Sequence, residues 1–321
     1  MIALPEIRCA SNRLKRIAVR TPLLSSMELD TRMRGKILFK TESLQITGSF
    51  KLRGAYNLMS QIPQDARKHG VVAWSSGNHA QGVAAAGQLL GLKTTLVMPK
   101  DAPRIKIGKT KALGGEVVFY DRITDDRESI ARAIAERRRS TLVPSYDHDE
   151  IIAGQGTVGL ELMQQCSELS LIPDQVIICC GGGGLSAGCS VAIKTLSPRT
   201  DIYIVEPEGY DDALRSLRSG VRESNKPNNP SICDALLAES TGLLTFRILK
   251  ALVSDGLVVS DSDVRDAMRF AFNILNIVVE PSGAVALAAV LCDKISVADK
   301  VTVVILSGGN VDKRSFFSIV E

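Results

Sequence analysis

The feature that most constrains the fold is an alternation of short aliphatic segments, which end in Gly, Ser or Pro, with longer segments of helical periodicity. Parallel sheets covered by helices produce this pattern, because their strands are buried on both faces and their crossover connections are helical. The fold class is therefore expected to be α/β with parallel-rich sheets. The pattern predicts strands at residues 71–74, 94–98, 116–120, 141–143, 175–179, 202–205 and 301–306.

The chain is long enough for two lobes. Its 321 residues are about twice the length of an ordinary domain. The segment 70–146 holds four of the predicted strands with helices between them, which is sufficient for a small lobe. We expect this small lobe to be mobile, and residues 1–69 and 147–321 to form a large lobe, which holds the glycine loop at 181–184 and is expected to bind its ligand.

Composition and charge exclude several classes of protein. Hydrophobic residues make up 45% of the chain and charged residues 23%, as in ordinary globular proteins. Only 4% are aromatic, which leaves no set of exposed rings for nucleic-acid bases to stack on. No apolar segment approaches the roughly 18 residues that a membrane span requires. We expect a protein that acts on a small molecule and binds neither nucleic acid nor a membrane.

Cysteine usage indicates the cellular compartment. The seven cysteines form no Cys-x-x-Cys pair, and several lie within apolar segments. Reduced thiols explain this distribution better than zinc ligands or disulfides do. The N-terminal segment also lacks the layout of a secretory signal. We therefore expect a cytoplasmic protein, and for its assembly a homodimer.

Polar loops follow four of the predicted strands. Their sequences are SSGNH, GGGGLSAG, EPEGYDD and SGGN. In open α/β sheets, ligands bind beyond the carboxyl ends of the strands. The four loops are therefore expected to converge on one site.

The glycine loop at 181–184 follows an apolar strand and precedes a segment of helical spacing. Such an arrangement presents free N–H groups and the positive end of a helix dipole to an anion, which predicts a phosphate site. Gly182, Gly184 and Ala187 also satisfy the GxGxxA dinucleotide fingerprint, and Glu206 follows at the position of a ribose-binding acid. An NAD-dependent dehydrogenase is therefore an alternative, although this fingerprint usually opens its domain and here follows several strands.

Lys51 follows a Thr-Gly-Ser turn at the start of a predicted helix. The field at a helix N-terminus favours the neutral amine, which is the form that attacks an aldehyde to make a Schiff base. A lysine at this position is otherwise a solvated surface charge, so its position alone does not decide between the two interpretations.

Five motifs, taken together, resemble the fold-type II pyridoxal-phosphate (PLP) enzymes: GSFKLRGA, SSGNHAQGVA, GGGGLSAG, EPSGA and LSGGN. The chain is most similar to the serine/threonine dehydratase and serine racemase branch. The resemblance implies a two-lobed fold like that of the tryptophan synthase beta chain, with PLP as cofactor. It also implies a carbon–oxygen lyase that converts L-threonine or L-serine to a 2-oxo acid and ammonia by β-elimination. A threo-3-hydroxyaspartate dehydratase and a serine racemase are the alternatives within the family, and a regulator without catalysis is one outside it.

The same resemblance implies which residues bind the cofactor. Lys51 would form the Schiff base, Phe50 would pack against the ring, and Asn78 would bond the ring hydroxyl. Ser307 would face the pyridine nitrogen, and because a serine does not hold this nitrogen protonated, elimination should compete well with transamination. Ala235 departs from the family, which usually has a glycine there. The backbone cradle for the phosphate would consist of Gly181, Gly182, Gly183, Gly184 and Leu185.

For the substrate, the resemblance implies that Lys51 takes the Cα proton and that Ser76 is a second acid/base on the opposite face. The loop that contains Ser75, Ser76, Asn78 and His79 would bind the carboxylate, and Arg127 would reach the substrate. Each assignment has an alternative. The loop would then be only a capped strand-to-helix turn, His79 a structural histidine and Arg127 an arginine on a helix surface.

A divalent cation is also implied. Glu206, the carbonyl of Tyr210 and Asp212 match the position where the racemase-like branch binds one. Such oxygen ligands suit Mg²⁺, Ca²⁺ or Mn²⁺. The alternative is a pair of solvated loop acids.

Overall fold

The computed structural model describes residues 2–75, 77–226 and 230–321. Within these residues the strands are β1 (Leu23–Ser25), β2 (Lys36–Thr41), β3 (Val71–Trp74), β4 (Thr94–Pro99), β5 (Glu116–Tyr120), β6 (Thr141–Leu142), β7 (Gln175–Cys179), β8 (Asp201–Pro207), β9 (Asp255–Val259) and β10 (Val301–Leu306). The helices are α1 (Leu4–Leu14), α2 (Met27–Met33), α3 (Lys51–Ser60), α4 (Gln64–Arg67), α5 (Asn78–Leu90), α6 (Arg104–Ala112), α7 (Arg127–Arg138), α8 (Asp149–Glu168), α9 (Gly184–Leu196), α10 (Asp212–Ser219), α11 (Leu243–Leu252), α12 (Asp261–Asn273), α13 (Pro281–Leu291) and α14 (Lys313–Val320), with a short 3₁₀ helix η1 (Glu42–Leu44).

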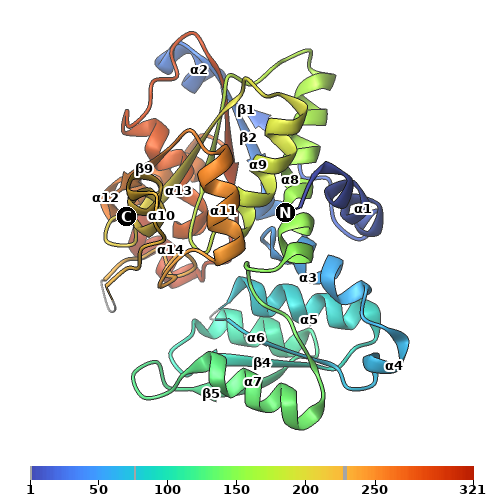
Figure 1. Ribbon diagram of the computed structural model, residues 1–321. Helices are drawn as coiled ribbons and strands as arrows, with labels where there is room; N and C mark the ends of the chain where they lie inside the picture. The colour runs from blue at the N-terminus through green and yellow to red at the C-terminus, as the bar shows by residue number, and fades with distance from the viewer. Residues whose placement is uncertain (1, 76, 227–229) are drawn as a thin grey trace.

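The larger sheet has six strands in the order β1-β2-β10-β7-β8-β9. All neighbouring strands are parallel except β1 and β2, which are antiparallel. Strand β2, from the N-terminal part of the chain, pairs with β10 near the C-terminus, with Thr41 opposite Leu306. This pairing brings the segments that follow the two strands to the same edge of the sheet (Figure 1).

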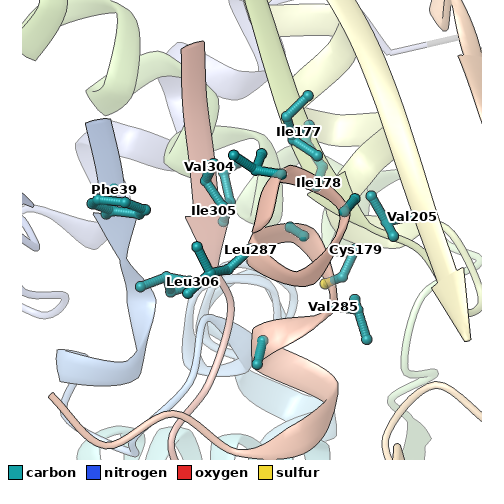
Figure 2. Close-up of a cluster of buried hydrophobic side chains, with 14 of the residues drawn as sticks. Phe39, Ile177, Ile178, Cys179, Val205, Val285, Leu287, Val304, Ile305 and Leu306 are labelled. Carbon is teal, nitrogen blue, oxygen red and sulfur yellow. The ribbon is translucent and has the colours of Figure 1, made fainter. Parts of the chain in front are cut away.

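Helices cover both faces of this sheet. Helix α13 packs against β7, β8, β9 and β10, and α12 packs on α13. On the other face, α9 packs on β7 and is itself covered by α8, α11 and α1. Figure 2 shows hydrophobic side chains that join β2, β7, β8 and β10 to α13, including Phe39, Ile177, Val285 and Leu306. These side chains are excluded from water, which is the main favourable term for folding.

The smaller sheet has four parallel strands in the order β5-β4-β3-β6. Helices α5 and α6 lie on one face and α7 on the other, in the lower part of Figure 1. Helix α3 packs on both α5 and α8, and its Leu52 and Met59 belong to the hydrophobic core of the smaller sheet. Lys51 therefore stands at the start of a helix that lies between the two sheets. The lobe boundaries and the mobility of the small lobe stay predictions.

All seven predicted strands are present. The sequence did not predict β1, β2 or β9, and the reason is clearest in β2. Lys40 lies in this strand with no exposed surface, so it breaks the aliphatic pattern. Its amine is 2.9 Å from the Glu161 carboxylate, and a paired charge can be buried where an isolated one cannot.

Over the described part of the chain, no helix is both long and apolar enough to cross a membrane.

Candidate active site

Three of the four polar strand-end loops line one cavity between the sheets. Asn78 comes from the loop after β3, the glycines at 181–184 from the loop after β7, and Ser307 from the loop after β10. Phe50, Lys51 and Leu185 line the same cavity. The fourth loop, EPEGYDD, does not, so the expectation that all four converge is wrong for this loop.

The carboxylate of Glu206 explains why the fourth loop lies elsewhere. Its two oxygens accept hydrogen bonds from the backbone N–H groups of Ala213 (3.0 Å) and Leu214 (2.8 Å). These N–H groups belong to the first turn of α10, where four donors have no partner within the helix. The chain after β8 is thereby held against α10, away from the cavity that Lys51 lines.

Lys51 extends its amine into the cavity beside the ring of Phe50, with Nζ 5.0 Å from the ring centroid. The amine donates a hydrogen bond to the backbone carbonyl of Ser145 at 2.9 Å. Burial away from water disfavours the ammonium form and lowers the pKa of Lys51 to about 8. A substantial fraction of the amine is therefore neutral near pH 8, as a nucleophile for an aldehyde requires.

The segment before Lys51 is fixed to the loop after β10. The N–H of Phe50 donates to the carbonyl of Ser307 at 3.2 Å, and Ser49 forms an isolated β-bridge with Gly308. These backbone contacts place the ring of Phe50 and the hydroxyl of Ser307 on the wall of one cavity. Both residues thus line the cavity that Lys51 also lines.

The glycine loop forms the wall of the cavity at the N-terminus of α9. Gly183 has a φ of +88°, which few other residues adopt. A Cβ added at Gly182 would lie 2.3 Å from the ring of Tyr146, so no side chain fits there. The carbonyl of Gly182 accepts hydrogen bonds from the Thr245 hydroxyl (2.8 Å) and the Gly242 N–H (3.2 Å). A loop held in this way at a helix N-terminus is suited to a phosphate.

Asn78 is held by two buried partners. Its amide nitrogen donates to Glu280, and its amide oxygen accepts a hydrogen bond from Asn310 at 3.0 Å. Because the amide carries two hydrogens, one N–H is left for a ligand. Glu280 is also 3.3 Å from the amine of Lys106, which ion-pairs with Asp234 at 2.7 Å.

A second cavity adjoins the first and shares Lys51, Asn78 and Gly182 with it. It contains Ser75, His79 and Arg127, so the structure brings these predicted substrate residues together. Ser76 lies outside the described residues. The guanidinium of Arg127 forms no ion pair with any carboxylate in the described part of the chain.

His79 is buried, with 2% of its surface exposed. Its Nε2 lies 2.9 Å from the carbonyl oxygen of Val143. Burial, assisted by the nearby Lys51, lowers the pKa of His79 to about 3. The imidazole is therefore neutral at physiological pH.

The two predicted acidic metal ligands are buried and lie close together. Burial raises the pKa of Glu206 well above its usual value, and the neighbouring charge of Asp212 raises it further. Burial also raises the pKa of Asp212 to about 6. The oxygens of Asp212 accept hydrogen bonds from Asn225 (2.6 Å) and the N–H of Thr241 (2.7 Å). The alternative of solvated loop acids is therefore wrong.

Sequence reasoning missed several residues that line the two cavities. Tyr146 lines both cavities and follows β6, so the rule that ligands bind at strand ends would have found it. Cys179 is the last residue of β7 and lies beside the Ser307 hydroxyl. Asp234 and Ser282 line the cavities as well, and the Ser282 hydroxyl accepts a hydrogen bond from the N–H of Ala235. Ala235, where the resemblance leads to the expectation of a glycine, lines both cavities.

The residues present fit PLP. The cavity offers a nucleophilic lysine, an aromatic side chain and a glycine cradle suited to a phosphate, and Asn78 and Ser307 supply polar groups. These are the groups that a pyridine aldehyde with a phosphate arm requires.

Comparisons with known proteins agree with this fit. Residues 14–308 match the family described as pyridoxal-phosphate dependent enzyme. L-threo-3-hydroxyaspartate ammonia-lyase from Pseudomonas sp is 42% identical over 313 residues, which cover 97% of this chain and 96% of that protein. Serine racemase from Schizosaccharomyces pombe is 40% identical over 308 residues, which cover 96% and 94%.

A solved structure gives the same result. The crystal structure of a threonine deaminase from T.th. superimposes with a TM-score of 0.91 at 42% identity, covering 97% of this chain and 99% of that one. The hypothesis of a dinucleotide-binding dehydrogenase is therefore wrong. The chain belongs to the family of pyridoxal-phosphate dependent enzymes, in its fold-type II group.

Proposed function

We propose that this protein is an ammonia-lyase that converts L-threonine or L-serine to a 2-oxo acid and ammonia. The observation that carries the proposal is the position of the Lys51 amine, which lines both the glycine-walled cavity and the cavity that contains Ser75 and Arg127. Two of the similar proteins are named as an ammonia-lyase and a deaminase of hydroxy amino acids. Because the net reaction releases ammonia, it is classed with carbon–nitrogen lyases, although the first heteroatom bond to break is carbon–oxygen.

The residues around the cofactor would divide the work as follows. PLP, when bound, withdraws electrons from the substrate Cα and so makes its proton removable. Lys51 holds the cofactor, and its neutral amine then accepts the Cα proton as general base. Asn78 and Ser307 would hold the ring through their polar side chains, and the glycine loop with Leu185 would bind the phosphate through backbone N–H groups. Phe50, which lines the same cavity, would pack against the ring.

The second cavity would bind and orient the substrate. Ser75 accepts a hydrogen bond from the N–H of Gly77, and the N–H groups in the first turn of α5 are further donors for a carboxylate. His79 lies in the first turn of the same helix. Loss of the Cα proton and of the β-hydroxyl as water, followed by addition of water to the remaining imine, gives the 2-oxo acid and ammonia.

A second candidate substrate is L-threo-3-hydroxyaspartate, and Arg127 is the observation that favours it. Arg127 lines the substrate cavity, and its guanidinium forms no ion pair with a carboxylate of the described residues. A second carboxylate on the substrate would supply the missing partner, and such charge-assisted bonds to arginine are strong and geometrically specific.

A divalent cation bound by Glu206, Asp212 and the carbonyl of Tyr210 is part of the proposal. Burial raises the pKa values of both carboxyl groups, and a bound cation would favour their charged forms. Each carboxylate oxygen accepts a hydrogen bond from the protein and keeps a further lone pair for Mg²⁺, Ca²⁺ or Mn²⁺. Among the described residues, no group of three or more acidic, His or Cys side chains could hold a metal, so the carbonyl ligand is required.

A homodimer and a cytoplasmic location complete the proposal. The free state of all seven cysteines supports a reducing compartment. Exposed apolar side chains such as Met27 and Ile46 support an oligomer, because association would remove them from water. Light scattering of the purified protein would measure its mass in solution.

The experiment that tests the proposed function is a product assay. Purified protein loaded with PLP is incubated with L-serine, L-threonine or L-threo-3-hydroxyaspartate, and the 2-oxo acid and ammonia are quantified separately. We expect equal amounts of the two products from at least one substrate. Neither product from any of the three would contradict the proposal.

A further inference from the structure

We propose that Nδ1 of His79 accepts a hydrogen bond from the β-hydroxyl of the substrate, which makes this histidine a specificity-determining residue. The inference rests on the proposed function, since it assigns the part of the cavity that recognises a hydroxy amino acid. It is carried by the tautomer of the imidazole, by an unpartnered buried nitrogen and by the position of His79 beside Lys51.

The tautomer of His79 is fixed by its neighbour. A carbonyl oxygen can only accept hydrogen bonds, so Nε2, which lies 2.9 Å from the carbonyl of Val143, must carry the hydrogen. Val143 is itself held in place, because its N–H donates to the carbonyl of Val72 at 2.9 Å. In a neutral imidazole the other nitrogen is then an acceptor with a free lone pair. Nδ1 of His79 is therefore an acceptor in the resting protein.

This acceptor has no partner in the protein. Nδ1 is buried, and among the described residues no donor lies within hydrogen-bond distance of it. Buried polar atoms of side chains are nearly always hydrogen-bonded, so an exception of this kind indicates a missing ligand. The imidazole lines the cavity that also contains Lys51, Ser75 and Arg127. A ligand in that cavity is the partner available to the unpaired nitrogen.

The chemistry of the substrate selects the donor. In an amino acid bound for reaction, the amino group is engaged at the cofactor and the carboxylate can only accept hydrogen bonds. The β-hydroxyl is the donor that remains, and L-serine, L-threonine and L-threo-3-hydroxyaspartate all have one. Because burial keeps the imidazole neutral, His79 would bind this hydroxyl as an acceptor and would not protonate it.

The first test measures binding without turnover. L-glycerate and L-lactate carry the same carboxylate and 2-hydroxyl, lack an amino group and differ only in the 3-hydroxyl. Their dissociation constants for the PLP-loaded protein are measured by calorimetry. We expect L-glycerate to bind about tenfold more tightly than L-lactate, the size of one hydrogen bond to a buried acceptor.

Two variants of His79 separate the roles of the two nitrogens. In His79→Gln the amide nitrogen can keep the bond to Val143, whereas no acceptor remains at the position of Nδ1. In His79→Asn the amide oxygen supplies an acceptor near that position and the bond to Val143 is lost. We expect the preference for L-glycerate to disappear in His79→Gln and to survive in part in His79→Asn. His69→Gln, which lies outside both cavities, is the control and should keep the full preference.

A kinetic test uses the ratio of kcat/KM for L-serine to that for β-chloro-L-alanine, which loses chloride and has no hydroxyl to donate. We expect this ratio to fall about tenfold in His79→Gln and less in His79→Asn.

Equal binding of L-glycerate and L-lactate to the unmodified protein, including no binding of either, would overturn the inference even if both variants failed to fold. A full preference in His79→Gln would overturn it as well. Failure of the proposed function is distinct, because it is recognised by the absence of products from all three hydroxy amino acids.

Discussion

The amine of Lys51 donates a hydrogen bond of 2.9 Å to the backbone carbonyl of Ser145, a residue 94 positions later in the chain. Lys51 begins the helix between the two sheets, and Ser145 lies a few residues after the last strand of the smaller sheet. The resting amine is thus held by the segment that leads from β6 to α8. Any movement of the smaller sheet relative to the larger would alter the position of this reactive group.

The lowered pKa of Lys51 predicts how cofactor capture depends on pH. Burial disfavours the ammonium form, so the neutral amine predominates above about pH 8 instead of above the usual value of about 10.4. The rate of PLP capture by the cofactor-free protein should therefore rise with pH and level off above about 8. Stopped-flow absorbance would measure it, and a rate still rising steeply above about pH 9 would show that the amine is not desolvated.

Arg127 should select for a second carboxylate on the substrate. Replacement by Met removes the charge, and we expect kcat/KM for L-threo-3-hydroxyaspartate to fall about tenfold to a hundredfold relative to that for L-serine. Arg127→Lys should restore part of this ratio. Arg132→Met is the control, because Arg132 pairs with Glu128 on the exposed face of α7. An unchanged ratio in Arg127→Met would return Arg127 to the role of a surface arginine.

The proposed cation should stabilise the folded protein. A ligand that binds only the native state adds about 2.7 kcal/mol at a hundredfold excess over its Kd, so Mg²⁺ or Ca²⁺ should raise the melting temperature of a metal-depleted sample. Glu206→Gln and Asp212→Asn should abolish the increase. Asp211→Asn, which removes an acid paired with Arg215, should retain it. If neither chelator nor added metal moved the melting temperature, the two acids would not be ligands.

Racemisation is predicted as a slow side activity, and the prediction rests on the sequence, because Ser76 lies outside the described residues. A second acid/base on the face opposite Lys51 is needed to return the proton to the other side of Cα. Ser76→Ala should reduce formation of D-serine from L-serine by about a hundredfold or more, while much of the dehydration remains. Chiral chromatography would measure both. No D-serine from the unmodified protein, or undiminished D-serine from Ser76→Ala, would eliminate the two-base hypothesis.

The parts of the site that the sequence predicts are those contained in continuous motifs. Lys51, with Phe50 beside it, and the glycine loop are each recognisable from adjacent residues, since the local turn and helix start determine their geometry. Asn78 and Ser307 belong to the same kind of strand-end loop. The seven predicted strands are likewise aliphatic over consecutive positions.

The parts that the sequence did not predict depend on contacts between distant segments. Lys106 lies in α6 and pairs with Glu280 and Asp234, so a lysine that resembles a solvated helix charge is in fact almost fully buried. Arg53 is buried in the same way between Glu42 and Glu161. Charge patterns within one helix cannot reveal such pairs, because the partners come from other elements.

A visible absorption spectrum tests whether Lys51 binds PLP and carries out the elimination. The purified protein with PLP should show the visible band of the cofactor bound to a lysine, and L-serine or L-threonine should perturb this band as the 2-oxo acid forms. Lys51→Ala should lose the band and at least a thousandfold in turnover, while melting as a folded protein. A Lys51→Ala protein that kept the band or full activity would exclude Lys51 as the residue that binds PLP and removes the proton.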